Sequence, residues 1–111
     1  MADASRDPRG APGIDVRRAA VPTPSRHGVE RSLLAEGLTP HAWGNVAGVS
    51  YDRHTHGYHK VLVCVSGSIV FHTDAGDVDL EPGDRMELAP GVQHGASVGP
   101  HGVQCVEAAR P

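Results

Sequence analysis

The sequence predicts an all-β domain, a sandwich or barrel made of short strands. Two observations support this prediction. The 111 residues include 14 Gly and 9 Pro, a composition that favours many turns over long helices. From His41 onward, short apolar or alternating runs are separated by turn signals about every eight to twelve residues. A chain of this length allows one domain with a modest core.

The first part of the chain, residues 1–28, is expected to be a flexible tail. It contains four prolines and five arginines, and its apolar residues follow neither the period of a strand nor that of a helix. Such a segment stays mobile or becomes ordered only against a partner. We therefore expect a disordered N-terminal tail followed by a single domain at residues 29–111.

One short helix is predicted at the start of this domain, within residues 29–38. Ser32 can cap it, Gly37 can end it, and Pro40 prevents it from continuing. One or two helical turns cannot provide a DNA-recognition helix together with its supporting helix. The sequence therefore does not predict a helix-turn-helix regulator.

The remainder of the domain is predicted to consist of strands joined by turns rich in Gly, Pro and Asp. An apolar run at residues 61–65 is typical of a buried strand, and the later runs are shorter or alternate between apolar and polar residues. The predicted strands are residues 61–65, 69–72, 78–80, 85–88, 96–98 and 103–106.

Charge and cysteine content narrow the possible settings and partners. The formal net charge of −3 provides no basic field for phosphates, so we expect no nucleic-acid partner. The longest apolar run has five residues, whereas a membrane helix needs about 20, so no membrane association is expected.

Cys64 and Cys105 have no CxxC spacing, and the N-terminus lacks the apolar block of a secretory signal. We expect a cytoplasmic protein with two buried thiols, and a single disulfide is the alternative.

The histidines are the most informative residues for function, and His54 and His56 form the clearest pair. Residues i and i+2 of a strand point to the same face. Two such imidazoles can converge on one metal ion, at about 2.0–2.1 Å per bond for zinc. Surface histidine pairs with this spacing are also common, so the pair alone does not define a metal site.

The wider spacing of Gly and His resembles the two signature motifs of the cupin superfamily. Gly48, the His54-x-His56 pair and Gly67 follow the first motif, and Gly83, Gly91 and His94 follow the second. The resemblance extends over residues 48–98. The sequence around the motifs is also similar to that of small single-domain bacterial cupins that have no assigned reaction.

This resemblance implies a small antiparallel jelly-roll barrel with His54, His56 and His94 as ligands of one metal ion. The ion would be a divalent transition metal (Zn, Fe, Mn, Ni or Cu), and the three imidazoles do not select among these. Three protein ligands leave a coordination position open, as catalytic sites do. The apolar wall of a pocket is expected to come from Trp43, Tyr51, Tyr58, Phe71 and Met86, with a place in the core as the favoured alternative for Phe71 and Met86.

The sequence departs from the family pattern at Lys60, which stands where the first motif has a carboxylate. Lys60 shares its parity with the interior-facing Leu62 and Cys64, so an inward side chain is expected. There it would act as a catalytic base or nucleophile, or would hold an anionic substrate together with the metal. A side chain that reaches solvent at the barrel mouth is the remaining alternative. His59 becomes a fourth metal ligand instead if the turn before it shifts the register of the strand.

Two classes of function therefore remain open. The first is a metal-binding cupin, with an open mononuclear site that can serve a small-molecule enzyme. The second is a non-enzymatic barrel without metal that binds a small anion. The fold alone does not choose between them, because one fold hosts many functions. We expect a homodimer in either case, since a small barrel has edge strands to cover and a thin core.

Overall fold

Two long strands organise the fold of the computed structural model, which describes residues 11–111. Strands β4 (His59–Thr73) and β7 (His94–Arg110) pair antiparallel over most of their length. The pairing shifts register near the middle, around Gly67. Gly67 has φ +72° and lies so close to Gly102 that an added Cβ would meet its carbonyl oxygen at 2.0 Å. Only glycine fits this bend, which lets each long strand belong to two halves of the barrel.

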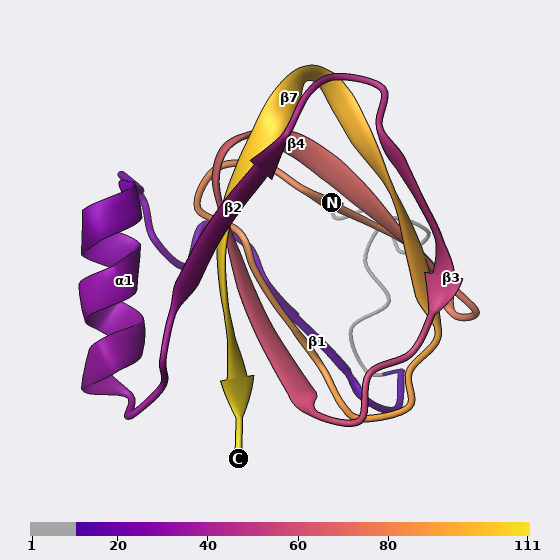
Figure 1. The fold of residues 1–111 in the computed structure, drawn as a ribbon, viewed down its shortest axis with the longest axis horizontal. Helices are drawn as coiled ribbons and strands as arrows, with labels where there is room; N and C mark the ends of the chain where they lie inside the picture. Colours follow the sequence, from indigo (N-terminus) through magenta and orange to yellow (C-terminus); the bar gives the residue numbers. More distant parts are fainter. Residues whose placement is uncertain (1–10) are drawn as a thin grey trace.

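The other strands extend the β4–β7 pair on both sides into one antiparallel sheet of seven strands. Beside the first half of β4 lie β6 and then β1, and β2 pairs with the second half of β7. At the opposite end of the two long strands, β5 pairs with β4 and β3 pairs with β7. The two halves face each other as an open barrel, seen in Figure 1. The shorter strands are β1 (Ile14–Arg17), β2 (His41–Asn45), β3 (Ser50–His54), β5 (Gly76–Leu80) and β6 (Arg85–Leu88).

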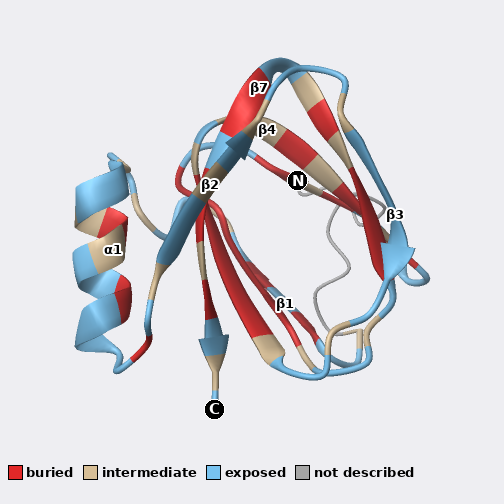
Figure 2. Ribbon diagram, in the orientation of Figure 1, coloured by how far each residue is buried: buried red, intermediate tan, exposed pale blue. Residues whose placement is uncertain are grey.

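This architecture confirms the prediction of a small, mostly antiparallel β-barrel with one N-terminal helix. Inward side chains of both halves form the main core, which includes Leu62, Cys64, Ile69, Phe71 and Met86. The single helix of the described residues, α1 (Arg26–Ala35), packs Val29 and Leu33 on the outer face of the sheet. Figure 2 shows this second buried layer between α1 and the barrel. It explains the continuous apolar run at residues 61–65, because residues 61–64 are buried on both faces and Val65 is partly buried against the second layer.

The helix begins earlier than the sequence predicts. Its N-cap is Ser25, whose side chain accepts a hydrogen bond of 3.1 Å from the Gly28 backbone N–H, so the assignment of this role to Ser32 is wrong. The predicted end is confirmed, since Gly37 follows the helix with φ +83°. Within residues 11–111, no helix is long and apolar enough to cross a membrane.

The prediction of a flexible tail is wrong for the part of residues 1–28 that the structure describes. Ile14 and Val16 are buried in β1, which pairs with β6 at the edge of the sheet. Beyond β1, the Asp84 carboxylate accepts a hydrogen bond of 2.9 Å from the Ala19 backbone N–H. Two apolar residues in alternation are too short a pattern to stand out in a sequence. The expectation for residues 1–10 falls outside the described residues.

Candidate metal centre and ligand pocket

Three histidines from distant parts of the chain meet inside the barrel. His54 ends β3 and is paired in register with His94, the first residue of β7. His56 lies two residues beyond β3, where its carbonyl accepts a hydrogen bond of 3.0 Å from the Gly91 backbone N–H. One ring nitrogen from each histidine lies within 4.8 Å of the other two. The structure therefore brings together the three imidazoles that the motif spacing singled out.

The geometry of this histidine cluster suits a metal ion. Three nitrogens bound to one tetrahedral zinc ion would be about 3.3 Å apart, so the observed spacing requires only small side-chain movements. The Nδ1–H group of His54 can donate to the Asp52 carbonyl at 2.8 Å, and that of His94 to the Val92 carbonyl at 2.9 Å. A hydrogen bond of this kind fixes the tautomer and leaves Nε2 with a free lone pair.

Two ring nitrogens of the cluster, one on His56 and one on His94, form no hydrogen bond within the described part of the chain. The Nε2 atoms of His56 and His94 are buried, and neither has a hydrogen-bond partner among residues 11–111. Burial lowers the pKa of both histidines, and the positive charge of Lys60 lowers it further. Neutral imidazoles are the form that binds metals, so the environment of the cluster fits the donor set.

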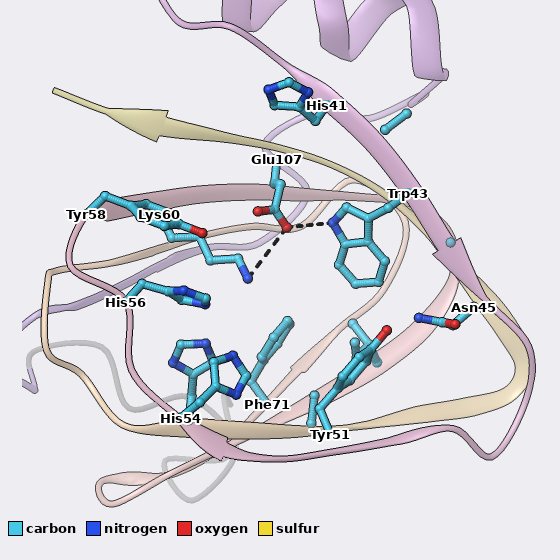
Figure 3. Close-up of a pocket in the computed structure, with 15 residues that line it drawn as sticks. His41, Trp43, Asn45, Tyr51, His54, His56, Tyr58, Lys60, Phe71 and Glu107 are labelled. Atoms are coloured by element: carbon cyan, nitrogen blue, oxygen red, sulfur yellow. Dashed lines mark hydrogen bonds and ion pairs between the residues drawn. The ribbon is translucent and has the colours of Figure 1, made fainter.

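Lys60 points into the same space, as the alternation of residues along β4 predicts. Figure 3 shows the end of its side chain between His56 and Glu107. Lys60 is buried, and its Nζ lies 3.5 Å from Oε1 of Glu107. The indole N–H of Trp43 donates to the same oxygen at 2.6 Å. The alternative in which Lys60 extends into solvent is therefore wrong.

Glu107 is the site residue that the sequence analysis missed. It lies on β7 and supplies the pocket with a carboxylate, although position 60 no longer does. Strand alternation could have predicted it. Every second residue of a strand points to the same face, and Val103 and Cys105 face the core, so Glu107 does too. The predicted strand ended at residue 106, one residue too early to include it.

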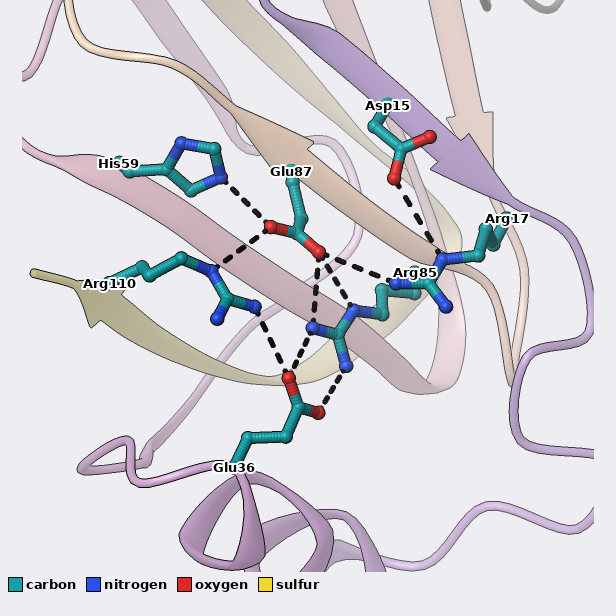
Figure 4. A network of polar contacts seen from close by, with 7 residues as sticks. All are labelled: Asp15, Arg17, Glu36, His59, Arg85, Glu87 and Arg110. Atoms are coloured by element: carbon teal, nitrogen blue, oxygen red, sulfur yellow. Dashed lines mark hydrogen bonds and ion pairs between the residues drawn. The ribbon is translucent and has the colours of Figure 1, made fainter.

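His59 is not part of the histidine cluster, and its prediction as a fourth ligand is wrong. Neighbouring residues of a strand point to opposite faces, so an inward Lys60 places His59 on the outside of the barrel. There its Nε2 lies 2.8 Å from Oε1 of Glu87. Figure 4 shows this contact within a network that also contains Glu36, Arg85 and Arg110.

The cluster and the Lys60–Glu107 pair line one side of a cavity of about 450 Å³. All four aromatic residues expected in its wall are present: Trp43, Tyr51, Tyr58 and Phe71. Trp43 and Tyr51 meet edge to face, with ring centroids 6.4 Å apart. Met86 is fully buried in the core, the alternative favoured for it, and Phe71 belongs to the core as well as to the cavity wall. The cavity thus combines an apolar wall with a charged and metal-competent end, the composition of a small-molecule site.

The remaining described histidines lie away from the cluster. His72 is on the outer face, where its ring nitrogens lie 2.9 Å from Asp77 Oδ1 and 2.8 Å from Ser97 Oγ. His27 and His101 are exposed, as expected for surface residues. His41, also expected at the surface, is exposed but lines the cavity from β2.

Sequence comparison places residues 38–104 within a known family, described as the AraC-like ligand binding domain. A comparison with curated proteins finds no sequence match. The fold is shared by many solved structures. An RmlC-like cupin from Shewanella frigidimarina is 27% identical, with a TM-score of 0.59 over 67% of this chain and 66% of that one. A Klebsiella pneumoniae protein with a double-stranded β-helix domain is 25% identical, with a TM-score of 0.58 over 67% of each chain.

A third similar structure is an enzyme. It is the DMSP lyase DddQ from Ruegeria pomeroyi, which is 20% identical with a TM-score of 0.62. The match covers 67% of this chain but only 38% of the lyase. At this level of identity the similarity concerns the fold alone.

Proposed function

The chain belongs to the AraC-like ligand-binding domain family of the cupin superfamily, and we propose that it binds a small organic anion at a divalent transition metal. The proposed metal ligands are His54, His56 and His94. The observation that best supports this proposal is the pair of buried Nε2 atoms that have no partner among the described residues. Leaving a buried polar atom unsatisfied costs about 1–3 kcal/mol. A metal ion would satisfy both atoms at once.

The charges in the pocket favour an anionic ligand. The Lys60 ammonium and the Glu107 carboxylate offset each other, and the three imidazoles bind a metal in their neutral form. A divalent cation would therefore leave a net positive charge at this end of the cavity. The ammonium has three N–H donors, of which Glu107 can engage one, so the others can bind a ligand carboxylate.

The rest of the ligand is proposed to be apolar and of modest size. Phe71, Tyr51 and Ile69 line the cavity beyond the charged end. A small organic acid with an aromatic or branched aliphatic group would match this division between polar and apolar walls. When bound, the metal would supply Lewis acidity at its open position. Lys60 would hold and orient the anion beside it, which is the role we assign to this residue in any catalysed reaction.

The setting of the protein is part of the same proposal. We propose a cytoplasmic protein, because Cys64 and Cys105 are both free and buried. We also propose a homodimer, because β2 and β3 lie at the edges of the sheet and all five residues of β3 are exposed. A second copy of the chain would cover such an edge.

Metal analysis tests the proposal. The purified, untagged protein should contain one transition-metal ion per chain when no chelator is used. His94→Ala should lose the metal, whereas the matched control His72→Ala, on the outer face, should keep it. A wild-type protein that takes up no metal, even after incubation with each candidate ion, would leave the rival function, a metal-free barrel that binds an anion through Lys60.

Ligand titration tests the anion. Calorimetric titration of the metal-loaded protein with phenylacetate should give binding that phenylacetamide, its neutral counterpart, does not give. Lys60→Met should weaken this binding, while Arg31→Met, which removes an exposed positive charge on α1, should not change it. Equal affinity for the acid and the amide would refute the anionic ligand but would leave the metal site intact.

A further inference from the structure

The two cysteines of the chain face each other across the long strands. Cys64 on β4 and Cys105 on β7 are direct partners in the register of the sheet. Both are free thiols, and their exposed fractions are 0% and 1%. They belong to the main core cluster, so both side chains point to the inside of the barrel. Neither residue has a role in the function proposed above.

The backbone around Cys64 shows which kind of pair the two residues form. The Cys64 N–H donates to the Asp84 carbonyl at 3.0 Å, and the Cys64 carbonyl accepts from the Gly83 N–H at 2.8 Å. Both backbone groups therefore point away from β7, which makes Cys64 and Cys105 a non-hydrogen-bonded pair. The Cα atoms of such pairs are about 4.5 Å apart, at the short end of the range of about 4.4–6.8 Å that disulfides span.

We propose that Cys64 and Cys105 form a reversible disulfide, a redox modification site built across β4 and β7 beside the ligand pocket. The oxidant is a small hydroperoxide. Because the two residues already face each other at this spacing, the bond forms within one chain and keeps the sheet intact. Closing it requires Cys64 to give up only weak sulfur contacts, 3.7 Å to the Ser66 carbonyl and 3.9 Å to the Gly67 carbonyl.

The chemistry assigns different roles to the two thiols. A hydrogen bond from Cys105 lowers the pKa of Cys64, whereas the same bond and burial raise the pKa of Cys105. The Cys64 thiolate attacks the peroxide oxygen, the O–O bond breaks, and protonation releases water and leaves a sulfenic acid. The Cys105 thiol then attacks the Cys64 sulfur and a second water leaves. In total, two thiols and one hydrogen peroxide give one disulfide and two waters.

Trp43 connects this pair to the pocket. It is the register partner of Cys105 on the next strand, β2, so the three side chains form one row on the inner face of the sheet. Trp43 lines the cavity and donates its indole N–H to Glu107, the partner of Lys60. Trp43 thus neighbours Cys105 in the sheet and also lines the cavity, so a change at Cys105 acts on the residue that holds Glu107.

Peptide mapping tests the proposal on the full chain, kept metal-free with a chelator and treated with hydrogen peroxide. Trypsin cleaves after Lys60 and Arg85 but not between Arg110 and Pro111, which places the cysteines in separate peptides, residues 61–85 and 86–111. We expect these two peptides to be linked, with a loss of two hydrogen atoms, and to separate after dithiothreitol. The fluorescence of Trp43, the single tryptophan, should fall on oxidation and recover on reduction.

The controls separate this bond from other oxidation products. Cys64→Ala and Cys105→Ala should each abolish the link and the reversible loss of fluorescence. If either variant fails to fold, the wild-type peptide map still decides. The proposal is overturned if both thiols remain available to iodoacetamide on unfolding after peroxide treatment, if links join two copies of one peptide, or if the link forms only in denaturant.

Discussion

At the scale of single residues, the site differs from the related motif in where its charged side chains stand. Position 60, where the related motif has a carboxylate, has a lysine, and a carboxylate is provided instead by Glu107 on β7. Lys60 Nζ and Glu107 Oε1 lie 3.5 Å apart, so the pocket contains one charge of each sign. The positive charge stands at position 60, where the motif has the negative one. The Glu107 carboxylate is held by Lys60 and Trp43, and the Lys60 ammonium lies between Glu107 and His56.

Lys60→Glu tests this placement. The substitution removes a positive charge beside the cluster and adds an oxygen ligand, so divalent metal should bind more tightly, by about tenfold or more. Competition with a coloured chelator measures the affinity. Lys60→Gln, which removes only the charge, should give an intermediate value, and Arg31→Glu on the exposed face of α1 should give the wild-type value. Unchanged affinity in Lys60→Glu would mean that position 60 does not face the metal.

The residues of the site could be predicted from the sequence to the extent that local spacing determines them. Motif spacing singled out His54, His56 and His94, and strand alternation predicted the inward Lys60. His59 was ambiguous because its orientation depends on the register after Gly57, which spacing does not fix. Glu107 could not be connected to Lys60, because their contact depends on the pairing of β4 with β7, two strands far apart in the sequence.

At the scale of elements, a charged clamp holds α1 against the sheet. Glu36 follows the last turn of the helix and accepts two hydrogen bonds from the Arg85 guanidinium, at 2.6 and 2.8 Å. Arg85 also pairs with Glu87 on the same strand. Because the hydrogen bonds from Arg85 favour the carboxylate form, the pKa of Glu36 falls to about 2.

This clamp should make stability depend on pH. The pKa of Glu36 is lower in the folded chain than its ordinary value of 4.5, so its contribution is present above pH 4.5. That contribution is lost as the pH falls from 4.5 toward 2. Urea unfolding at several pH values should show a smaller decline in the free energy of unfolding for Glu36→Gln than for the wild type. Parallel curves for the two proteins would contradict the clamp. Glu30→Gln, on the same helix, serves as the control.

The bend at Gly67 is a second feature at this scale. In Gly67→Ala the new Cβ would meet the Gly102 carbonyl oxygen at 2.0 Å, and alanine would also have to adopt φ +72°. We expect a destabilisation of about 2–4 kcal/mol from the clash and the strained backbone together. Urea denaturation measures it. Gly57→Ala is the matched control, because an added Cβ there has no neighbour within 4 Å, and a similar effect of both substitutions would contradict this explanation.

Elements were predicted best where burial gives a strong pattern. The buried halves of β4 and β7 were found, but each strand was predicted as two, because the glycines at their bends look like turns in the sequence. Strand β1 was missed because it has only two buried residues, and β2 and β3 because they are largely exposed. The formation of such edge strands depends on pairing with neighbouring strands rather than on the hydrophobic pattern of their own residues.

At the scale of the whole molecule, the barrel has sheet edges, at β2 and β3, that no other strand of residues 11–111 covers. Sedimentation analysis should therefore show a homodimer at micromolar concentration. Substituting Tyr51 would disturb the pocket, so the variant of choice is Asp52→Pro, which removes a backbone donor from the exposed strand β3 and should shift the protein toward the monomer. Wild-type protein that sediments as a monomer at high concentration would contradict the dimer.

The central claim is that three histidines bind one metal ion inside the barrel, and X-ray absorption at the edge of the bound metal tests it most directly. We expect three imidazole nitrogens, at about 2.0–2.1 Å if the ion is zinc, and the loss of this signal in His94→Ala. A spectrum without imidazole scattering, or one unchanged by that substitution, would show that the ion binds elsewhere.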